Sequence, residues 1–321
     1  MGRLNKSLFA IVSQREVAPR SFLLQLEGDT SAITGSGQFV QVALPGRYLR
    51  RPISVCNVTV PQASDQALGQ DGHSYQAPCQ APAQVQALQA SNSLGRLTLL
   101  YKIMGAGTDQ MAAMQPGDTL ELLTGLGKGF DTSACREKAL LVGGGMGVAP
   151  LYLLAQELLA QGKQVQVILG FNQASEICLE DEFRALGSGL NTLSDADAKE
   201  SPSSSARLDV IISTADGSRG VKGFVTDAIK TLAVSNADTL SDADAASGGP
   251  ASAPYDYFYT CGPMVMMKAV CALCPTDGQA SLEERMGCGF GICYGCTVAT
   301  QDGPRRVCAD GPVFTKTQLG W

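Results

Sequence analysis

The segment Lys138-Ala-Leu-Leu-Val-Gly-Gly-Gly-Met-Gly-Val-Ala-Pro150 joins an apolar run to closely spaced glycines and a proline. The run from Lys138 to Val142 predicts a strand, and the helical periodicity of Leu151 to Ala160 predicts the helix that follows. Glycines between a strand and a helix let the backbone approach a phosphate, although their spacing here is not G-x-G-x-x-G. The turn is therefore either a nucleotide-binding loop or simply a close strand–helix connection. Its glycines are Gly143, Gly144, Gly145 and Gly147.

Strands and helices continue to alternate after this segment. The expected strands cover Val165 to Phe171, Leu208 to Ser213 and Tyr255 to Cys261; the expected helices cover Glu180 to Leu186, Gly223 to Leu232 and a last one from Pro263. Alternation of this kind predicts a parallel α/β nucleotide-binding domain, placed at residues 135–279. Because such sheets bind ligands at the carboxyl ends of their strands, Cys261, Gly262 and Pro263 are expected near a nicotinamide. Two polar inserts share the hexapeptide Leu-Ser-Asp-Ala-Asp-Ala, at 193–198 and 240–245, and are expected to form solvated loops.

The first part of the chain shows strand-like rather than helical patterns. Its short apolar runs cover Leu8 to Val12, Phe22 to Leu26, Phe39 to Leu44, Ile53 to Val60, Leu97 to Ile103 and Thr119 to Leu123. Short strands separated by Gly and Pro predict an antiparallel β-barrel or sandwich, placed at residues 1–134. A Gln/Ala-rich stretch at 62–93 is expected to be a long hairpin insertion on the surface.

Four cysteines near the end of the chain predict an iron–sulfur centre. Cys288, Cys293 and Cys296 are spaced C-x4-C-x2-C, with Cys308 downstream, which is the plant-type pattern for a 2Fe–2S cluster. Structural zinc and unligated thiols are the alternatives, but zinc sites usually contain two short C-x2-C pairs. The cluster would occupy a small C-terminal lobe, residues 280–321. The other cysteines, such as Cys56, Cys178 and Cys271, are expected to be buried.

Two motifs of the first domain suggest a flavin site. Arg51, Pro52, Ile53 and Ser54 place a cation and a hydroxyl on either side of a rigid proline, although an arginine in a surface ion pair would look the same. Lys102 to Thr108 ends another strand with glycines and a hydroxyl, a geometry whose backbone amides can hold a pyrophosphate. A flavin would connect the single electrons of a cluster to two-electron chemistry.

Composition excludes several classes of protein. The chain is 45% hydrophobic and 17% charged with a net charge of -6, which is typical of globular proteins and unlike the basic surfaces that bind nucleic acid. The single histidine, His73, argues against histidine-based catalysis. The uncharged stretch Ala139 to Gln156 imitates a membrane span, but its glycines and Pro150 divide it. Without a signal-like N-terminus the protein is expected in the cytoplasm, with no membrane contact.

Taken in order, these motifs resemble the ferredoxin-reductase family. The run Ser281 to Cys296 and the run Arg306 to Phe314 are most similar to the electron-transfer subunits of dihydroorotate dehydrogenase B, and the resemblance spans Ser7 to Phe314 apart from the inserts. It implies binding of FAD, a 2Fe–2S cluster and NAD. It also implies a partner, an FMN-containing dihydroorotate dehydrogenase catalytic subunit, in a heterotetramer of two of each subunit. Electrons would then pass from the partner's FMN through the cluster and FAD to NAD+, in pyrimidine (UMP) biosynthesis.

Carried over by motif, the resemblance assigns residues to each cofactor. The FAD contacts would be Arg51, Pro52, Ile53, Ser54, Leu100, Tyr101, Lys102, Gly107 and Thr108, and the cluster ligands Cys288, Cys293, Cys296 and Cys308. The chain departs from the family in its low-complexity inserts and in a shorter connection between Cys296 and Cys308. No side chain of this chain would need to act as an acid or base. NAD is expected rather than NADP, because Phe171 to Glu176 contains no arginine to meet a 2′-phosphate.

Three other functions fit part of the pattern. A self-contained NADH-dependent reductase that feeds an oxygenase would need a full ferredoxin domain, and few residues follow Glu283. A subunit of a ferredoxin:NADP oxidoreductase complex would share the architecture but should show an altered cluster ligand set. A non-enzymatic zinc-stapled binding module would leave the glycine turns empty.

Overall fold

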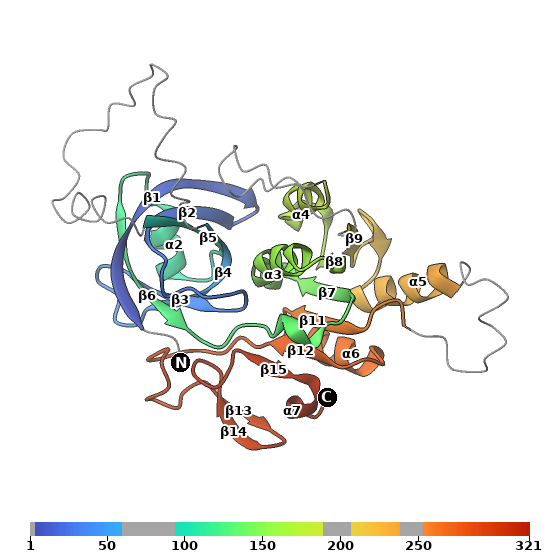
Figure 1. Cartoon of the computed structure of the whole chain (residues 1–321). Coiled ribbons are helices and arrows are strands. Elements are labelled where there is room, and N and C mark those ends of the chain that lie inside the picture. Colours follow the sequence, from blue (N-terminus) through green and yellow to red (C-terminus); the bar gives the residue numbers. More distant parts are fainter. Residues whose placement is uncertain (1–3, 60–93, 189–206, 238–252) are drawn as a thin grey trace.

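The computed structural model describes residues 4–59, 94–188, 207–237 and 253–321. The Gln/Ala-rich insertion, both Leu-Ser-Asp-Ala-Asp-Ala inserts and His73 lie outside the described residues. Within them, a β-barrel lies beside an α/β sheet, and the C-terminal segment runs beneath both (Figure 1).

A closed antiparallel barrel forms the first part of the chain. Its strands are β1 (Asn5–Ala18), β2 (Ser21–Asp29), β3 (Phe39–Ala43), β4 (Arg51–Thr59), β5 (Leu94–Lys102) and β6 (Thr119–Leu126), joined in the order β1-β2-β5-β4-β3-β6. Alternating apolar residues line the interior, among them Phe9, Leu24 and Leu97, all without exposed surface. Helix α2 (Ala106–Ala112) lies between β5 and β6 in the sequence. All six predicted strands and the barrel itself are confirmed.

A seven-stranded sheet forms the second part. Its order is β10-β9-β8-β7-β11-β12-β15, with β7 (Lys138–Gly144), β8 (Gln164–Phe171), β9 (Arg207–Thr214), β10 (Val221–Lys222), β11 (Tyr257–Cys261), β12 (Gly278–Ser281) and β15 (Val313–Thr315). All neighbours are parallel except β12 and β15. After β10 the chain crosses to the other side of β7, so β7 and β11 form the switch point where such sheets bind ligands.

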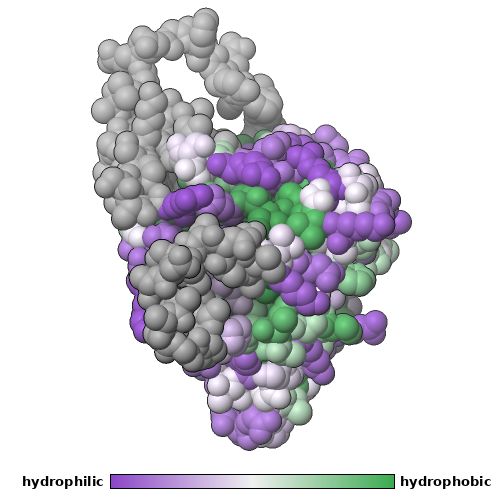
Figure 2. Space-filling view, turned by 90° about the vertical axis from the view of Figure 1, so that its right-hand side faces the viewer, coloured by the Kyte–Doolittle hydropathy of each residue, from purple (hydrophilic) through white to green (hydrophobic). Residues whose placement is uncertain are grey.

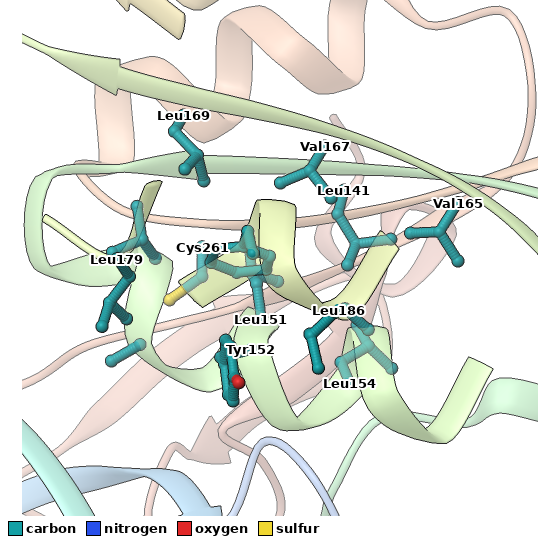
Figure 3. Packing of buried hydrophobic residues seen from close by; sticks show 14 of the residues in the cluster. Leu141, Leu151, Tyr152, Leu154, Val165, Val167, Leu169, Leu179, Leu186 and Cys261 are labelled. Atoms are coloured by element: carbon teal, nitrogen blue, oxygen red, sulfur yellow. The ribbon is translucent and has the colours of Figure 1, made fainter. Parts of the chain in front are cut away.

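Helices cover both faces of this sheet. Leu141 and Val167 point toward α3 (Ala149–Ala160) and α4 (Glu180–Gly187), and Figure 3 shows this apolar layer. Leu140 and Ile168 point the opposite way, toward α5 (Val225–Ala237) and α6 (Met264–Leu273). Burial on both faces explains the nearly continuous apolar strands of the sequence. The side of the molecule that faces right in Figure 1 is largely hydrophilic, with a smaller hydrophobic patch (Figure 2).

Along the chain, the cysteine segment lies between β12 and β15, two strands of this sheet. After β12 the chain runs through the cysteine loop and the hairpin of β13 (Thr297–Thr300) and β14 (Gly303–Arg306), then returns as β15 and the short helix α7 (Lys316–Leu319). An apolar cluster joins this segment to the barrel and the sheet through Phe39, Leu126, Met267, Leu282, Val307 and Phe314. The boundary predicted between residues 279 and 280 falls inside β12. The segment from residue 280 onward is therefore continuous with the sheet, because its own apolar residues are too few to form a separate core.

The stretch that imitates a membrane span becomes β7 and α3. Among the described residues, no helix has both the length and the apolar character needed to cross a bilayer. The predicted burial of three cysteines is also confirmed: Cys56 and Cys271 have no exposed surface, and Cys178 is 4% exposed.

Candidate functional site

The four cysteines of the tail gather as two pairs. In the first pair, the N–H of Cys293 lies 3.5 Å from Sγ of Cys288, and the N–H of Cys288 lies 3.5 Å from Sγ of Cys293. In the second pair, the N–H of Cys308 donates to Sγ of Cys296 at 3.4 Å. The β13–β14 hairpin brings the second pair together, because the N–H of Val307 bonds to the carbonyl of Cys296 at 3.0 Å.

This donor set fits a 2Fe–2S cluster better than a single zinc ion. Each iron of such a cluster takes two thiolates, whereas zinc needs four ligands around one centre. Among the described residues, no three His, Cys, Asp or Glu side chains converge on one metal position. The pairing of Cys288 with Cys293 and of Cys296 with Cys308 is the arrangement in which each iron of a 2Fe–2S cluster would take two thiolates.

The backbone around the first pair stabilises a thiolate. Burial would raise the pKa of Cys288, but hydrogen bonds from the N–H groups of Cys293, Phe290 and Ile292 outweigh it and lower the pKa to about 6. Gly289 and Gly291 adopt φ values of 80° and 92°, which turn these amides toward the sulfur. Burial raises the pKa of Cys308 to about 12, so it requires the charge of a bound metal to ionise at neutral pH.

The predicted FAD residues meet at one edge of the barrel. Strands β4 and β5 are antiparallel neighbours, so the start of β4 lies beside the end of β5. Arg51 lies directly over the backbone of Gly107, since a Cβ added to that glycine would be 2.2 Å from Nε of the arginine. Arg51 and Gly107, distant in sequence, thus lie in direct contact at this edge, with the arginine side chain covering the buried glycine.

Not every predicted FAD residue presents its side chain to this edge. Tyr101 points into the barrel, where its hydroxyl donates to Oε1 of Gln14 at 3.0 Å and its ring stacks on Phe22. Leu100 and Ile53 are also buried in apolar clusters, so only the backbone of these three residues is available to a ligand. Pro52 is exposed, and Ser54 is partly exposed.

The other two predicted FAD residues have partners within the protein. The hydroxyl of Thr108 accepts from the N–H of Met104 at 2.9 Å and caps its own helix, and Nζ of Lys102 lies 3.7 Å from the carboxylate of Glu176.

The four glycines of the loop after β7 differ in the space beside them. A Cβ on Gly147 would lie 2.3 Å from the carbonyl oxygen of Cys261, and one on Gly144 would lie 2.4 Å from Sδ of Met266. Gly143 is similarly close to Leu151. Gly145 alone in this loop has a φ of 54° and no atom within 4 Å of the added Cβ. Three glycines therefore pack the loop and Gly145 faces open space, while nucleotide binding by this loop stays a prediction.

Cys261 ends β11 beside this loop with its sulfur in the apolar core. It is 1% exposed and lies among Leu151, Tyr152 and Leu179 (Figure 3). Burial, and secondarily the nearby Glu283 carboxylate, raise the pKa of the thiol far above its ordinary value. Cys261 is therefore not a nucleophile at neutral pH. The next residue, Gly262, has a φ of 148° and packs on the backbone of Gly144, while Pro263 caps α6.

Two residues near these sites had no sequence signal of their own. Glu283 lies two residues beyond Ser281, the register partner of Cys261, and desolvation raises the pKa of its carboxyl group. Arg306 precedes Cys308 by two residues and bonds to the cysteine loop. The pairing of β11 with β12 brings Glu283 near Cys261, and the β13–β14 hairpin turns Arg306 toward the cysteine loop.

The segment after β8 contains the carboxylate of Glu176, which accepts from the side chain of Asn172 at 2.9 Å. An arginine does lie nearby on the neighbouring connection, Arg219, but Glu180 pairs with it at 3.0 Å. The preference for NAD over NADP stays a prediction.

Comparison with known proteins assigns the family. The chain is 33% identical over 301 residues to the "Dihydroorotate dehydrogenase B (NAD(+)), electron transfer subunit" of Fusobacterium nucleatum subsp. nucleatum, covering 92% of this chain and 95% of the relative. The chain belongs to this family of electron transfer subunits. Residues 283–320 match the iron–sulfur cluster binding domain of dihydroorotate dehydrogenase B, and residues 141–272 match the oxidoreductase NAD-binding domain.

Solved structures share the fold of this electron transfer subunit. The NADH-dependent reduced ferredoxin-NADP oxidoreductase superposes with a TM-score of 0.67 at 24% identity, over 98% of this chain and 90% of that one. A ferredoxin NADP+ reductase from Neisseria gonorrhoeae with bound FAD and NADP gives 0.54 at 15% identity, over 84% and 91%. The predicted fold class is confirmed, and the two family matches support the predicted iron–sulfur cluster and NAD. Binding of FAD stays a prediction.

Proposed function

We propose that this chain carries electrons from a separate catalytic subunit to NAD+. In this proposal the partner is an FMN-containing dihydroorotate dehydrogenase, which oxidises dihydroorotate to orotate in pyrimidine (UMP) biosynthesis. The observation that carries it is the pairing of four cysteines directly against a flavin-reductase barrel and an NAD-type sheet. The family name of the Fusobacterium nucleatum relative supports the same assignment.

Each part of the chain would hold one cofactor. Cys288 with Cys293, and Cys296 with Cys308, would bind the two irons. Arg51, Ser54 and the backbone of Gly107 would hold FAD, while Gly145 and the turn after Cys261 would receive NAD. When bound, the cluster supplies one-electron transfer, and FAD connects it to the hydride chemistry of NAD.

The chain's own side chains would position these groups rather than act as acids or bases. Arg51 donates from Nη1 to the carbonyl of Leu49, and its remaining N–H groups would bind a flavin phosphate through charge-assisted hydrogen bonds. The thiol of Cys261 is buried, so the nicotinamide would meet the turn that follows it at Gly262 and Pro263 rather than the sulfur.

The proposed assembly contains two copies of each subunit and is located in the cytoplasm. This extends what the family name supports, which is membership of a multi-subunit enzyme. Native mass spectrometry of the co-purified complex should give two electron transfer chains and two FMN-containing chains.

Visible spectroscopy and metal analysis test the proposal. The purified chain should show flavin absorption, release FAD on denaturation, and contain about two irons and two labile sulfides per chain. Cys296→Ser should lose the EPR signal of the reduced cluster and block electron transfer to the partner, while NADH oxidation with an artificial dye persists through FAD. Cys271→Ala, at a buried cysteine of α6 that packs in a different apolar cluster from Cys296 and Cys308, should keep both activities.

Two results would contradict this function. One zinc per chain with no colour would favour the zinc-stapled binding module. An active lone chain that reduces an acceptor without a partner would favour the self-contained reductase.

A further inference from the structure

Arg306 connects the two loops that carry the tail cysteines. Its Nη1 donates to the carbonyl oxygen of Gly291 at 2.8 Å, within the loop from Cys288 to Cys296. Its Nε and Nη2 donate to the two carboxylate oxygens of Asp310 at 3.0 and 3.2 Å, in the turn after Cys308. One planar guanidinium thus bonds to both loops at once, which a lysine ammonium cannot do with the same geometry.

The backbone of Arg306 strengthens the same connection. Its N–H donates to Asp310 Oδ2 at 2.9 Å, and its carbonyl accepts from the N–H groups of Ala309 and Asp310 at 3.1 and 2.8 Å. Gly291 leaves little space beside it, because an added Cβ would lie 2.8 Å from Cβ of Ala309 and 3.2 Å from Nη1 of Arg306. The cysteine loop therefore lies directly against this turn.

Arg306 also supports the strained residue between Cys293 and Cys296. Tyr294 has a φ of 58°, a left-handed conformation that is unfavourable for a non-glycine residue. The guanidinium carbon of Arg306 lies 5.1 Å from the centre of the Tyr294 ring, within range of a cation–π interaction. The hydroxyl of Thr297 donates to the Tyr294 carbonyl at 2.7 Å. These contacts hold the conformation that places Cys293 and Cys296 on either side of Tyr294.

We propose that Arg306 is the positioning residue of the iron–sulfur site: it ties the three-cysteine loop to the Cys308 turn, and its charge favours reduction of the bound cluster. The proposal rests on the proposed function, because it assumes that the four cysteines hold a 2Fe–2S cluster.

The charge of Arg306 should shift the midpoint potential of the bound cluster in a predictable direction. Reduction adds a negative charge to a site that already contains four thiolates, so a nearby cation favours the reduced form and a nearby carboxylate opposes it. Arg306 places its cation against the cysteine loop, at Gly291, and Asp310 takes the other edge of the guanidinium. Loss of the arginine charge should lower the midpoint potential, and loss of the Asp310 charge should raise it.

Four variants of the purified, flavin- and cluster-containing protein test this inference. Arg306→Gln should lower the midpoint potential of the cluster and release iron to a chelator several-fold faster. Arg306→Lys should keep the midpoint potential near that of the unmodified protein but still release iron faster. Lysine keeps the positive charge but cannot bond to Gly291 and Asp310 with the geometry of the planar guanidinium. Asp310→Asn should also release iron faster, with a shift to higher potential. Arg305→Gln, the same change on the neighbouring exposed residue of β14, should alter neither quantity.

The outcomes distinguish this proposal from the proposed function. If Arg306→Gln and Arg305→Gln gave the same potential and the same iron release, Arg306 would have no positioning role. Equal iron release in Arg306→Lys and the unmodified protein would overturn the bracing role. A potential that moves the same way in Arg306→Gln and Asp310→Asn would overturn the charge effect. Absence of iron from the unmodified protein would instead contradict the function itself.

Discussion

Gly107 has no space for a side chain because Arg51 fills it. An added Cβ would lie 2.2 Å from Nε and 2.6 Å from Nη2 of that arginine. The glycine is buried in α2, where alanine would otherwise be the better helix former. Glycine at this position therefore makes room for Arg51, although it does not favour the helix.

Gly107→Ala should weaken FAD binding without destabilising the protein. The methyl group would push the flexible arginine aside and remove a charge-assisted contact, an effect of about 1.5–3 kcal/mol, or roughly tenfold or more in affinity. The melting temperature should stay level or rise, since alanine favours the helix. Flavin content after gel filtration and a fluorescence titration with FAD measure the effect. Gly105→Ala is the control, because no atom lies within 4 Å of its added Cβ; equal FAD affinity in the two variants would exclude Arg51 as a contact.

At the start of β7, one carboxylate accepts hydrogen bonds from three backbone N–H groups. Asp256, just before β11, accepts from the N–H groups of Arg136, Glu137 and Lys138 at 2.8, 2.8 and 2.7 Å. These bonds join the first residues of β7 to β11, the two strands of the switch point. Asp256 thus holds the start of β7 in place, at the end of the strand opposite to the glycine loop.

Asp256→Asn should lower the free energy of unfolding by about 1–2 kcal/mol, because an amide cannot accept from all three donors and the site is partly open to solvent. Burial would raise the pKa of Asp256, but the three backbone hydrogen bonds outweigh it and hold the pKa below its ordinary value of 3.8. A lowered folded-state pKa gives stability that is present above the unfolded-state pKa and is lost as pH falls through the folded value.

Denaturant titrations of the unmodified protein and of Asp256→Asn at several pH values measure this linkage. The difference in the free energy of unfolding between the two proteins should be largest near neutral pH and should narrow below pH 3.8. A difference that stays constant over this range would show that the carboxylate charge contributes nothing.

At the scale of the whole molecule, a few polar contacts connect the barrel to the α/β part. The carboxylate of Glu157 in α3 accepts from the N–H and the hydroxyl of Ser36 at 2.8 and 2.6 Å. Arg15 of β1 pairs with Glu182 of α4 at 2.9 Å. These contacts, together with the apolar cluster that Leu23, Cys56 and Leu100 share with α3, join the two parts.

Glu157→Ala should destabilise the molecule by about 1–3 kcal/mol, because it leaves the two Ser36 donors unpaired. Glu157→Gln should cost less, since its amide oxygen still accepts one hydrogen bond and burial already disfavours the charge by raising the pKa of Glu157. Thermal unfolding compares the variants. Arg15→Gln is a control with a small expected effect, because its ion pair is exposed. Equal melting temperatures for Glu157→Ala and the unmodified protein would show that water replaces the carboxylate as the hydrogen-bond acceptor of Ser36.

The presence of an iron–sulfur segment and the order of strands and helices could be predicted because both depend on local patterns. The spacing of Cys288, Cys293 and Cys296 and the apolar periods around Val142 are properties of short segments. The strand β12 was missed, since Gly278 to Ser281 carries no strong apolar pattern and is a strand only because it pairs with β11. Its burial comes from neighbours that are distant in sequence.

The sequence alone therefore determined the family, the fold class and the iron–sulfur and NAD-binding character of the chain, because each depends on residue types at fixed spacing along the chain. Tertiary structure decided which of those residues face a ligand. Gly145 is open while Gly147 packs on Cys261, and Tyr101 turns into the barrel while Arg51 lies over Gly107. It also placed Arg306 against Gly291. Such roles depend on the distance between segments that fold together, and spacing along the chain contains no measure of that distance.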